Sequence, residues 1–219
     1  MSVAGLIPMK GHSERVPGKN LRPIAGKPLF HWIAETLLGA AAVDEVIVDT
    51  DSDVIEEAVR ASFPSISLHR RPEHLRGDLV PMHDVVAEVA RSVGHEHILQ
   101  THSTNPLLRS ATVDAAIAAF LDPGPHDSLM SVTALRTRLY FDDGRPVNHD
   151  PAVLVRTQDL DPVYEENSNI YIAPRELITA TGKRIGTDPL LFVMPREEAV
   201  DIDEELDFLV AEFLLERHG

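Results

Sequence analysis

The sequence predicts an α/β protein with a doubly wound, mostly parallel sheet. Short apolar runs typical of buried strands alternate with segments whose apolar residues recur at helical spacing. A basic, glycine-bearing loop follows the first apolar run, at the carboxyl end of a strand, where sheets of this kind bind ligands. The chain contains no internal repeat and no low-complexity linker. We therefore expect a single domain over residues 1–219.

Apolar runs rich in β-branched residues predict the strands, at residues 3–7, 45–50, 66–69, 97–101, 129–135, 152–156, 169–173 and 190–194. Pro8 is expected to end the first strand, because proline cannot donate a backbone hydrogen bond. Helical spacing predicts helices over residues 29–38 and 53–62, one that Gly94 ends, one over 110–120, a short one at Pro174, and a closing helix from about residue 203. Either Asp51 or Ser52 can cap the second helix, and either Ser110 or Thr112 can cap the fourth.

Composition excludes several classes of protein. The chain has 35 Asp and Glu against 20 Lys and Arg, a formal net charge of -15, so nucleic acid and anionic membranes are not expected partners. It contains no cysteine, which excludes disulfides and thiolate metal sites. No apolar run is long enough to span a membrane, and the first residues do not resemble a signal peptide. We expect a cytoplasmic protein.

The loop between Ile7 and Leu29 concentrates cations in this acidic chain: Lys10, Arg15, Lys19, Arg22 and Lys27. Backbone N–H groups and lysines that converge after a strand favour phosphate binding, although a solvated surface loop is the simpler alternative. A Walker A loop is excluded, because Gly18-Lys19 is followed by Asn20 and position 13 is serine. The dinucleotide fingerprint Gly-x-Gly-x-x-Gly is absent as well.

Residues 7–21, Ile-Pro-Met-Lys-Gly-His-Ser-Glu-Arg-Val-Pro-Gly-Lys-Asn-Leu, closely resemble the opening motif of the acylneuraminate cytidylyltransferases, which are related to the Kdo cytidylyltransferases. Residues 167–172, Asn-Ser-Asn-Ile-Tyr-Ile, are similar to the family's Asn-Gly-Ala-Ile-Tyr. Residues 201–207, Asp-Ile-Asp-Glu-Glu-Leu-Asp, are similar to its closing Asp-Ile-Asp-Thr-Glu-Leu-Asp. The resemblance covers essentially the whole chain. It implies a Rossmann-like sheet of the nucleotide-diphospho-sugar transferase type.

By resemblance, the enzyme would transfer CMP from CTP to the anomeric hydroxyl of a nine-carbon, neuraminate-like sugar acid and release pyrophosphate. The nucleotide-binding residues would be Lys10, Gly11, Ser13, Lys19, Asn20 and Arg71, and the catalytic ones Lys10, Lys19 and Asp203. The acceptor would contact His102, Arg156, Asn167 and Tyr171. Asp201 and Asp203 would hold Mg²⁺, which prefers oxygen ligands. The resemblance also implies a homodimer formed by an excursion at about residues 136–165.

The residues themselves leave two interpretations of Asp203 open. It precedes a helix with an apolar set at residues 206, 209, 210, 213 and 214, so it could act only as an N-cap. If residues 200–203 are extended, however, Asp201 and Asp203 face the same side with Ile202 opposite. That spacing favours a metal site, since capping does not explain Asp201.

Several positions depart from the family's pattern. His102 replaces a usual glutamine, Glu14 a usual cation, and Glu165 an arginine often found near the sugar-acid pocket. A glutamate would repel the substrate carboxylate, so Arg156 or another cation would have to bind it. These departures leave two alternatives: a nucleotidyltransferase acting on another sugar or a sugar phosphate, and a catalytically silent nucleotide- or sugar-binding protein.

Overall fold

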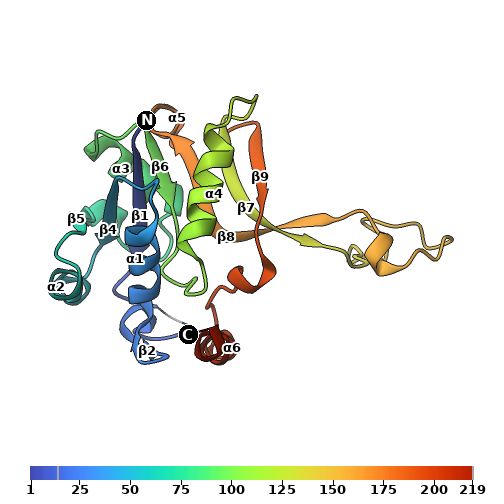
Figure 1. Ribbon diagram of the computed structural model, residues 1–219, viewed down its shortest axis with the longest axis horizontal. Helices are drawn as coiled ribbons and strands as arrows, with labels where there is room; N and C mark the ends of the chain where they lie inside the picture. Colours follow the sequence, from blue (N-terminus) through green and yellow to red (C-terminus); the bar gives the residue numbers. More distant parts are fainter. Residues whose placement is uncertain (14, 219) are drawn as a thin grey trace.

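The computed structural model of the chain describes residues 1–13 and 15–218, so that Glu14 lies outside the described residues. These residues form a seven-stranded sheet with the order β5-β4-β1-β6-β8-β7-β9 (Figure 1). Strand β8 pairs antiparallel with both of its neighbours, whereas the other pairings in this sheet are parallel. The predicted doubly wound, mostly parallel α/β fold is confirmed.

The strands of this sheet are β1 (Val3–Met9), β4 (Glu45–Thr50), β5 (Ser67–Arg70), β6 (His97–Gln100), β7 (Ser128–Leu135), β8 (Val163–Pro174) and β9 (Pro189–Val193). The α-helices are α1 (Leu29–Gly39), α2 (Asp53–Ser62), α3 (Met82–Ser92), α4 (Ser110–Leu121), α5 (Arg175–Thr181) and α6 (Glu205–His218). A small hairpin of β2 (Pro23–Ile24) and β3 (Lys27–Pro28), which the sequence analysis did not predict, precedes α1.

Helices cover both faces of the sheet because alternate residues of β1 point to opposite sides. Val3, Ile7 and Met9 pack with α1, α2 and α4 on one face, whereas Ala4 and Leu6 pack with α3 and α5 on the other. β1 lies between β4 and β6, so the order of the strands reverses there. Ligands of doubly wound sheets bind at this point, beyond the carboxyl ends of the strands.

The prediction that Pro8 ends the first strand is wrong. β1 continues to Met9, and Pro8 is paired with Asp49 of β4. The carbonyl of Leu6 accepts from Thr101 N just beyond β6, so the backbone of Pro8, two residues later, faces the same side after β6 has ended. The missing N–H of proline therefore removes no hydrogen bond from the sheet.

Two further local predictions are corrected. Residues 152–156 form the end of a turn and an irregular segment rather than a strand, and a short 3-10 helix, η3 (Thr157–Asp159), follows them. The hydroxyl of Ser110 does not cap α4 but donates to the carbonyl of Thr36 on α1 (2.7 Å), which ties the two helices together. The cap of α2 is confirmed, since Ser52 Oγ accepts from Ile55 N.

The segment between the ends of β7 and β8 extends away from the sheet as an arm, defined as residues 136–162 (Figure 1). Tyr140 and Pro146 form a bridge within it, and Arg136 and Arg138 donate to carbonyls of the arm itself. The arm holds itself together mainly by such local contacts, and it falls within the predicted excursion at 136–165.

The closing helix α6 begins at Glu205 and buries a different set of residues from the predicted apolar one. Phe208, Ala211 and Leu215 pack against Ile24, Leu29 and Leu107. Of the predicted set, four side chains are exposed: Leu206, Leu209, Val210 and Phe213. The helix is apolar on two sides, so periodicity alone could not select the buried one. No helix in the described part of the chain combines the length and the apolarity that crossing a membrane requires.

Candidate active site

A cleft of about 520 Å³ opens at the carboxyl ends of β1 and β6, at the reversal of strand order. Its wall combines cations of the loop after β1, polar residues after β6 and the aspartates that precede α6. The lining residues are Pro8, Lys10, His12, Ser13, Arg15, Lys19, Asn20, Asp78, Met82, His102, Ser103, Thr104, Ser168, Asp201 and Asp203. The structure therefore brings Lys10, Ser13, Lys19, Asn20, His102, Asp201 and Asp203 of the predicted site together.

The loop after β1 is fixed by the buried side chain of Asn20. Its Nδ2 donates to the carbonyl of Lys10 (2.9 Å), and its Oδ1 accepts from Ser103 Oγ (2.8 Å). One amide thus links both ends of the loop to the segment after β6. Because both atoms are used in this way, Asn20 positions the loop; its predicted role in nucleotide binding stays a prediction.

Gly11 is required by a close approach between the loop and the start of α2. Its N–H donates to Asp51 Oδ1 (2.7 Å), and a Cβ at this position would lie 2.7 Å from Ser52 Cβ. Any larger residue would push the loop away from α2. The N–H of Gly11 is thus committed to Asp51, and its predicted contact with the nucleotide stays a prediction.

The two aspartates before α6 project into the cleft as the spacing predicts. Ile202 between them is fully buried against α6, and its N–H donates to the carbonyl of Thr104 (3.0 Å). Asp203 does not cap α6. The carboxylate of Asp207 takes that role, since its Oδ2 accepts from Asp203 N (3.0 Å) and Glu204 N (2.7 Å).

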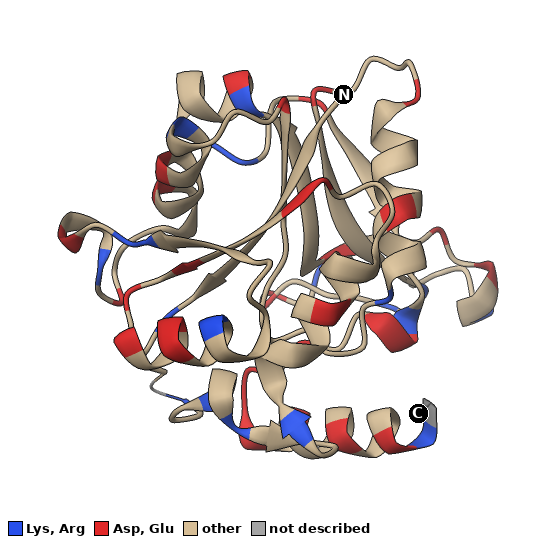
Figure 2. Cartoon of the chain, turned by 60° about the vertical axis from the view of Figure 1, so that its left-hand side comes forward, with Lys and Arg blue, Asp and Glu red and all other residues tan. Residues whose placement is uncertain are grey.

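Cations of the loop after β1 face these aspartates. Arg15 Nη2 donates to Asp203 Oδ1 (2.6 Å), and Lys19 Nζ lies 3.9 Å from the same oxygen and donates to the carbonyl of Ile202 (2.8 Å). Burial lowers the pKa of Lys19, and the nearby Asp203 and Asp201 partly oppose this effect. Figure 2 shows basic positions beside acidic ones at the end of the molecule that holds α6. Opposite charges thus meet across the cleft.

Asp201 meets a simple test for a metal ligand. Its Oδ1 is buried and has no hydrogen-bond partner among the described residues. Burial raises the pKa of Asp201, the neighbouring charge of Asp203 adds to the rise, and a hydrogen bond from Thr104 and the charge of Lys19 oppose it. A divalent cation would remove this cost by neutralising both carboxylates. No group of three His, Asp or Glu side chains suited to a metal occurs in the described residues, so phosphate oxygens and water would complete the coordination.

A second group of polar side chains lies at the other end of the cleft, around His102. Burial lowers the pKa of His102 to about 4, and the charges of Arg184 and Lys19 act in the same direction. The imidazole is therefore neutral at pH 7, and its buried Nε2 is without a hydrogen-bond partner in the described part of the chain. The ring centre of Tyr171 lies 6.3 Å away.

Ser168 is a lining residue that the sequence analysis did not assign. It adopts a positive φ of 56°, next to the irregularity where β8 shifts its pairing with β7. This conformation strains residues other than glycine, and the resembling family motif has glycine here. A serine in place of that glycine was the feature of the sequence that could have identified Ser168. Arg15, also unassigned, is one of the five cations of the loop after β1, and that concentration of charge was its signal in the sequence.

Other predicted residues lie outside the cleft lining. Arg71 is buried at the end of β5, where its Nη2 lies 2.5 Å from Asp49 Oδ2 and its Nη1 has no partner among the described residues. Asn167 is buried too, accepting from Ser131 Oγ (2.6 Å). Arg156 is on the arm, 74% exposed and paired with Asp159. The structure thus does not bring Arg71 and Arg156 together with the cleft, and their assigned roles stay predictions.

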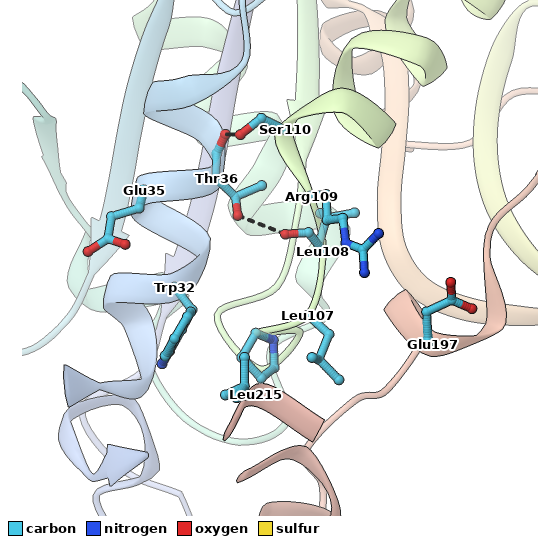
Figure 3. A pocket seen from close by; sticks show the side chains of 10 residues that line it. Trp32, Glu35, Thr36, Leu107, Leu108, Arg109, Ser110, Glu197 and Leu215 are labelled. Carbon is cyan, nitrogen blue, oxygen red and sulfur yellow. Dashed lines mark hydrogen bonds between the residues drawn. The ribbon is translucent and has the colours of Figure 1, made fainter. Parts of the chain in front are cut away.

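A separate cavity of about 380 Å³ lies between α1, the start of α4 and α6 (Figure 3). Trp32, Thr36, Leu107 and Leu215 are among its lining residues, and the hydroxyl of Thr36 donates to the carbonyl of Leu108 (2.8 Å). It shares no lining residue with the cleft described above. None of the predicted site residues line it.

The sheet and its cleft define an α/β protein of the doubly wound class, in which ligands bind at the switch point. A model of the family described as "Cytidylyltransferase" matches residues 4–204. The chain belongs to the cytidylyltransferase family. This confirms the resemblance to the cytidylyltransferases.

Curated relatives carry three kinds of name. The chain is 27% identical over 225 residues to "N-acylneuraminate cytidylyltransferase A" of Danio rerio, covering 99% of this chain and 51% of that protein. It is 38% identical over 118 residues to "3-deoxy-manno-octulosonate cytidylyltransferase" of Geobacter sulfurreducens, covering 54% and 45%. It is 25% identical over 228 residues to "CMP-N,N'-diacetyllegionaminic acid synthase" of Legionella pneumophila, covering 99% and 97%. The chain spans about half the length of the first two.

Solved structures share the fold at low identity. A CMP:2-keto-3-deoxy-manno-octonic acid synthetase complexed with CTP has a TM-score of 0.72 and 18% identity, with both chains covered completely. A 4-diphosphocytidyl-2C-methyl-D-erythritol synthase from Anaerococcus prevotii also has a TM-score of 0.72, at 13% identity, covering 99% of this chain and 96% of that one. At these identities the similarity supports the fold alone.

Proposed function

We propose that the chain transfers CMP from CTP to the anomeric hydroxyl of a nine-carbon, neuraminate-like sugar acid. The observation that carries this proposal is the opposition of Asp201 and Asp203 to the lysines of the β1 loop across one cleft. Triphosphate and a divalent cation require such a pair of surfaces, one basic and one acidic. Membership of the cytidylyltransferase family supports cytidine as the base.

The chain's own residues would first bind and orient the triphosphate. Lys10 and Lys19 line the cleft and would neutralise its charge, and the hydroxyl of Ser13 would donate to a phosphate oxygen. Arg15 would exchange its present partner Asp203 for a phosphate oxygen. Asn20 keeps the loop in register with the segment after β6, so the lysines are placed before the nucleotide arrives.

Mg²⁺ is the divalent cation that we propose for Asp201 and Asp203. When bound, it would supply charge neutralisation and Lewis-acid polarisation of the phosphate to be attacked. Asp201 Oδ1, buried and unpartnered among the described residues, supports this assignment. Asp203 would exchange Arg15 and Lys19 for the metal ion.

The acceptor would enter beside His102 and Ser168, at the end of the cleft away from α2. In the transfer, the anomeric oxygen forms a bond to the α-phosphorus and loses its proton to water, the bond from that phosphorus to the bridging oxygen breaks, and pyrophosphate leaves with that oxygen. The neutral imidazole of His102 can accept a hydrogen bond from an acceptor hydroxyl. The names of the Danio and Legionella relatives support a nine-carbon acid.

Two alternative functions make different predictions. Another acceptor, such as a sugar phosphate, is consistent with the same cleft, because the phosphate-binding loop does not recognise the acceptor. A silent binding protein is disfavoured by Asp201, because burial raises the pKa of this carboxyl and its Oδ1 has no hydrogen-bond partner among the described residues, which is costly without a ligand. Turnover of a nucleotide would exclude the silent binding protein, whereas both the proposed reaction and transfer to another acceptor require it.

We also propose that the chain forms a homodimer through its arm. Six large apolar or aromatic side chains of the arm and its base are exposed: Tyr140, Phe141, Val147, Val153, Leu154 and Tyr164. So much exposed apolar surface on an extended element is typical of an interface. A cytoplasmic location stays an expectation.

Pyrophosphate release tests the proposed reaction. Purified protein is incubated with Mg²⁺, each of the four nucleoside triphosphates, and N-acetylneuraminate, N,N'-diacetyllegionaminate or 3-deoxy-manno-octulosonate. We expect release with CTP and at least one nine-carbon acid, and a CMP-sugar as the product. Turnover with CTP and a sugar phosphate but no sugar acid would favour the other acceptor class.

A further inference from the structure

Arg184 is a largely buried cation near the acceptor end of the cleft that the proposed reaction has not used. It follows α5 in the segment that leads to β9, and its side chain is only 18% exposed. That segment is fixed at its end, since the carboxylate of Asp127 accepts from the N–H groups of Thr187 (2.7 Å) and Asp188 (3.2 Å). Arg184 is therefore mounted on an anchored loop rather than a mobile one.

The guanidinium of Arg184 is oriented by two residues of the central strands. Its Cζ lies 3.7 Å from the centre of the Tyr171 ring, and its Nη1 donates to Gln100 Oε1 (2.6 Å). Gln100 and Tyr171 are paired across β6 and β8, so both contacts come from one rigid part of the sheet. Stacking on an aromatic ring fixes the plane of the guanidinium and leaves its edge free to donate.

The donors of Arg184 are not saturated. Among the described residues the guanidinium makes this single hydrogen bond, and Glu166 Oε1 lies 3.9 Å from its Nη2. Glu166 is itself engaged by the hydroxyl of Tyr171. A guanidinium with unused donors, held largely out of water, favours a carboxylate that can accept two parallel hydrogen bonds.

The position of Arg184 is next to the cleft. Its Cζ lies 3.7 Å from the centre of the Tyr171 ring, and the centre of that ring lies 6.3 Å from that of His102, which lines the cleft. The proposed reaction assigns the cleft's other cations to the triphosphate: Lys10, which lies near Asp78 (3.5 Å), and Arg15 and Lys19, which lie near Asp203. The acceptor of the proposed reaction carries a carboxylate on the carbon that bears its reacting hydroxyl.

The geometry points to Arg184 as the residue that binds the carboxylate of the sugar-acid acceptor. This inference rests on the proposed function. The free edge of the guanidinium would donate hydrogen bonds to the carboxylate, while Gln100 and Tyr171 keep the plane of the guanidinium fixed. The anomeric hydroxyl would then point toward the α-phosphate. Arg156 cannot serve in the same subunit's cleft in this way, because it is exposed on the arm and paired with Asp159. Glu165 lies near the start of β8, beside the arm, so a carboxylate bound by Arg184 would not have to lie against it.

The test compares Arg184→Gln and Arg184→Lys with the wild type, using the best of the three sugar acids and its methyl ester. We expect Arg184→Gln to raise KM for the acid roughly 10- to 100-fold, the usual effect of losing a hydrogen-bonded charge pair. KM for CTP should stay unchanged, which also reports that the variant folds. Arg184→Lys should lie between the two, because it keeps the charge without the planar fork.

The ester supplies the readout that a merely structural role would not change. Wild type should prefer acid to ester, and Arg184→Gln should use the two equally well. Arg91→Gln, at an exposed arginine of α3 paired with Glu88, is the matched control and should keep the preference for the acid. If Arg184→Gln retained the wild-type preference, or raised KM for CTP instead, the inference would be overturned while the proposed function stood. If the wild type used no sugar acid, both would fail.

Discussion

Arg15 and Asp203 are 188 positions apart in the chain, yet Arg15 Nη2 donates to Asp203 Oδ1 at 2.6 Å. The pair joins the loop after β1 to the residues before α6, which form opposite walls of the cleft. Both side chains are partly exposed, so solvent screens the attraction and the pair contributes little to stability. The pair can therefore separate without a large cost in free energy, so that Arg15 could bind a phosphate and Asp203 a metal ion.

Asp203→Asn should lower CTP-dependent pyrophosphate release by about 100-fold or more, because an amide is a poor ligand for Mg²⁺. Mn²⁺ binding, followed by electron paramagnetic resonance in the presence of CTP, should weaken in parallel. Glu204→Gln makes the same chemical change at the adjacent exposed position and should leave both properties unchanged. Equal activity of Asp203→Asn and the wild type would show that the metal assignment is wrong.

Gly11→Ala should weaken CTP binding because its Cβ would lie 2.7 Å from Ser52 Cβ, too close for either backbone to stay in place. We expect a loss of about 1–3 kcal/mol in unfolding free energy, typical of overpacking, together with a higher KM for CTP. Gly94→Ala is the control, since nothing lies within 4 Å of a Cβ there. Denaturant unfolding and initial rates measure the two effects. Two variants of equal stability would contradict the close-approach argument.

His102→Gln should make the protein less sensitive to acid. The pKa of His102 is about 4 in the folded chain against 6.5 as the ordinary value, so between these pH values the unfolded state binds more protons. Stability is therefore lost as pH falls from about 6.5 to 4, by an amount on the order of 3 kcal/mol at most. The variant should lack this part of the pH dependence.

Urea unfolding at several pH values from 4 to 7 measures this dependence. The exposed His74 provides the control, because His74→Gln should retain the acid sensitivity of the wild type. If His102→Gln lost as much stability as the wild type over this range, burial of a neutral imidazole would not be its cause.

The fold could be predicted because each central strand is buried on both faces. Such strands consist of continuous apolar runs, which are recognisable in the sequence. Residues 45–50 and 53–62, for example, match β4 and α2. The strand predicted at residues 152–156 is wrong for the opposite reason. Their apolar side chains, such as Leu154, are exposed on the arm and carry no information about local pairing.

The side of the cleft formed by the β1 loop and the two aspartates could be predicted, because its residues lie in two short segments, 10–20 and 201–203. The surroundings of Arg184 could not be predicted to the same extent. Arg184, Gln100 and Tyr171 come from a loop and two strands, and only the folded sheet brings them together. The sequence likewise could not show which side of α6 is exposed, because a helix that is apolar on two sides has no single periodic face.

Leu154→Asp should dissociate the proposed homodimer. Leu154 is 93% exposed on the arm, so the charge should not destabilise a monomer, whereas burying it in an interface would be costly. Sedimentation equilibrium should show a dimer for the wild type and a monomer for the variant, with unchanged thermal unfolding of the monomer. Leu79→Asp, at a leucine that is 98% exposed outside the arm, should remain dimeric. A monomeric wild type, or dimeric Leu154→Asp, would contradict a dimer interface at Leu154.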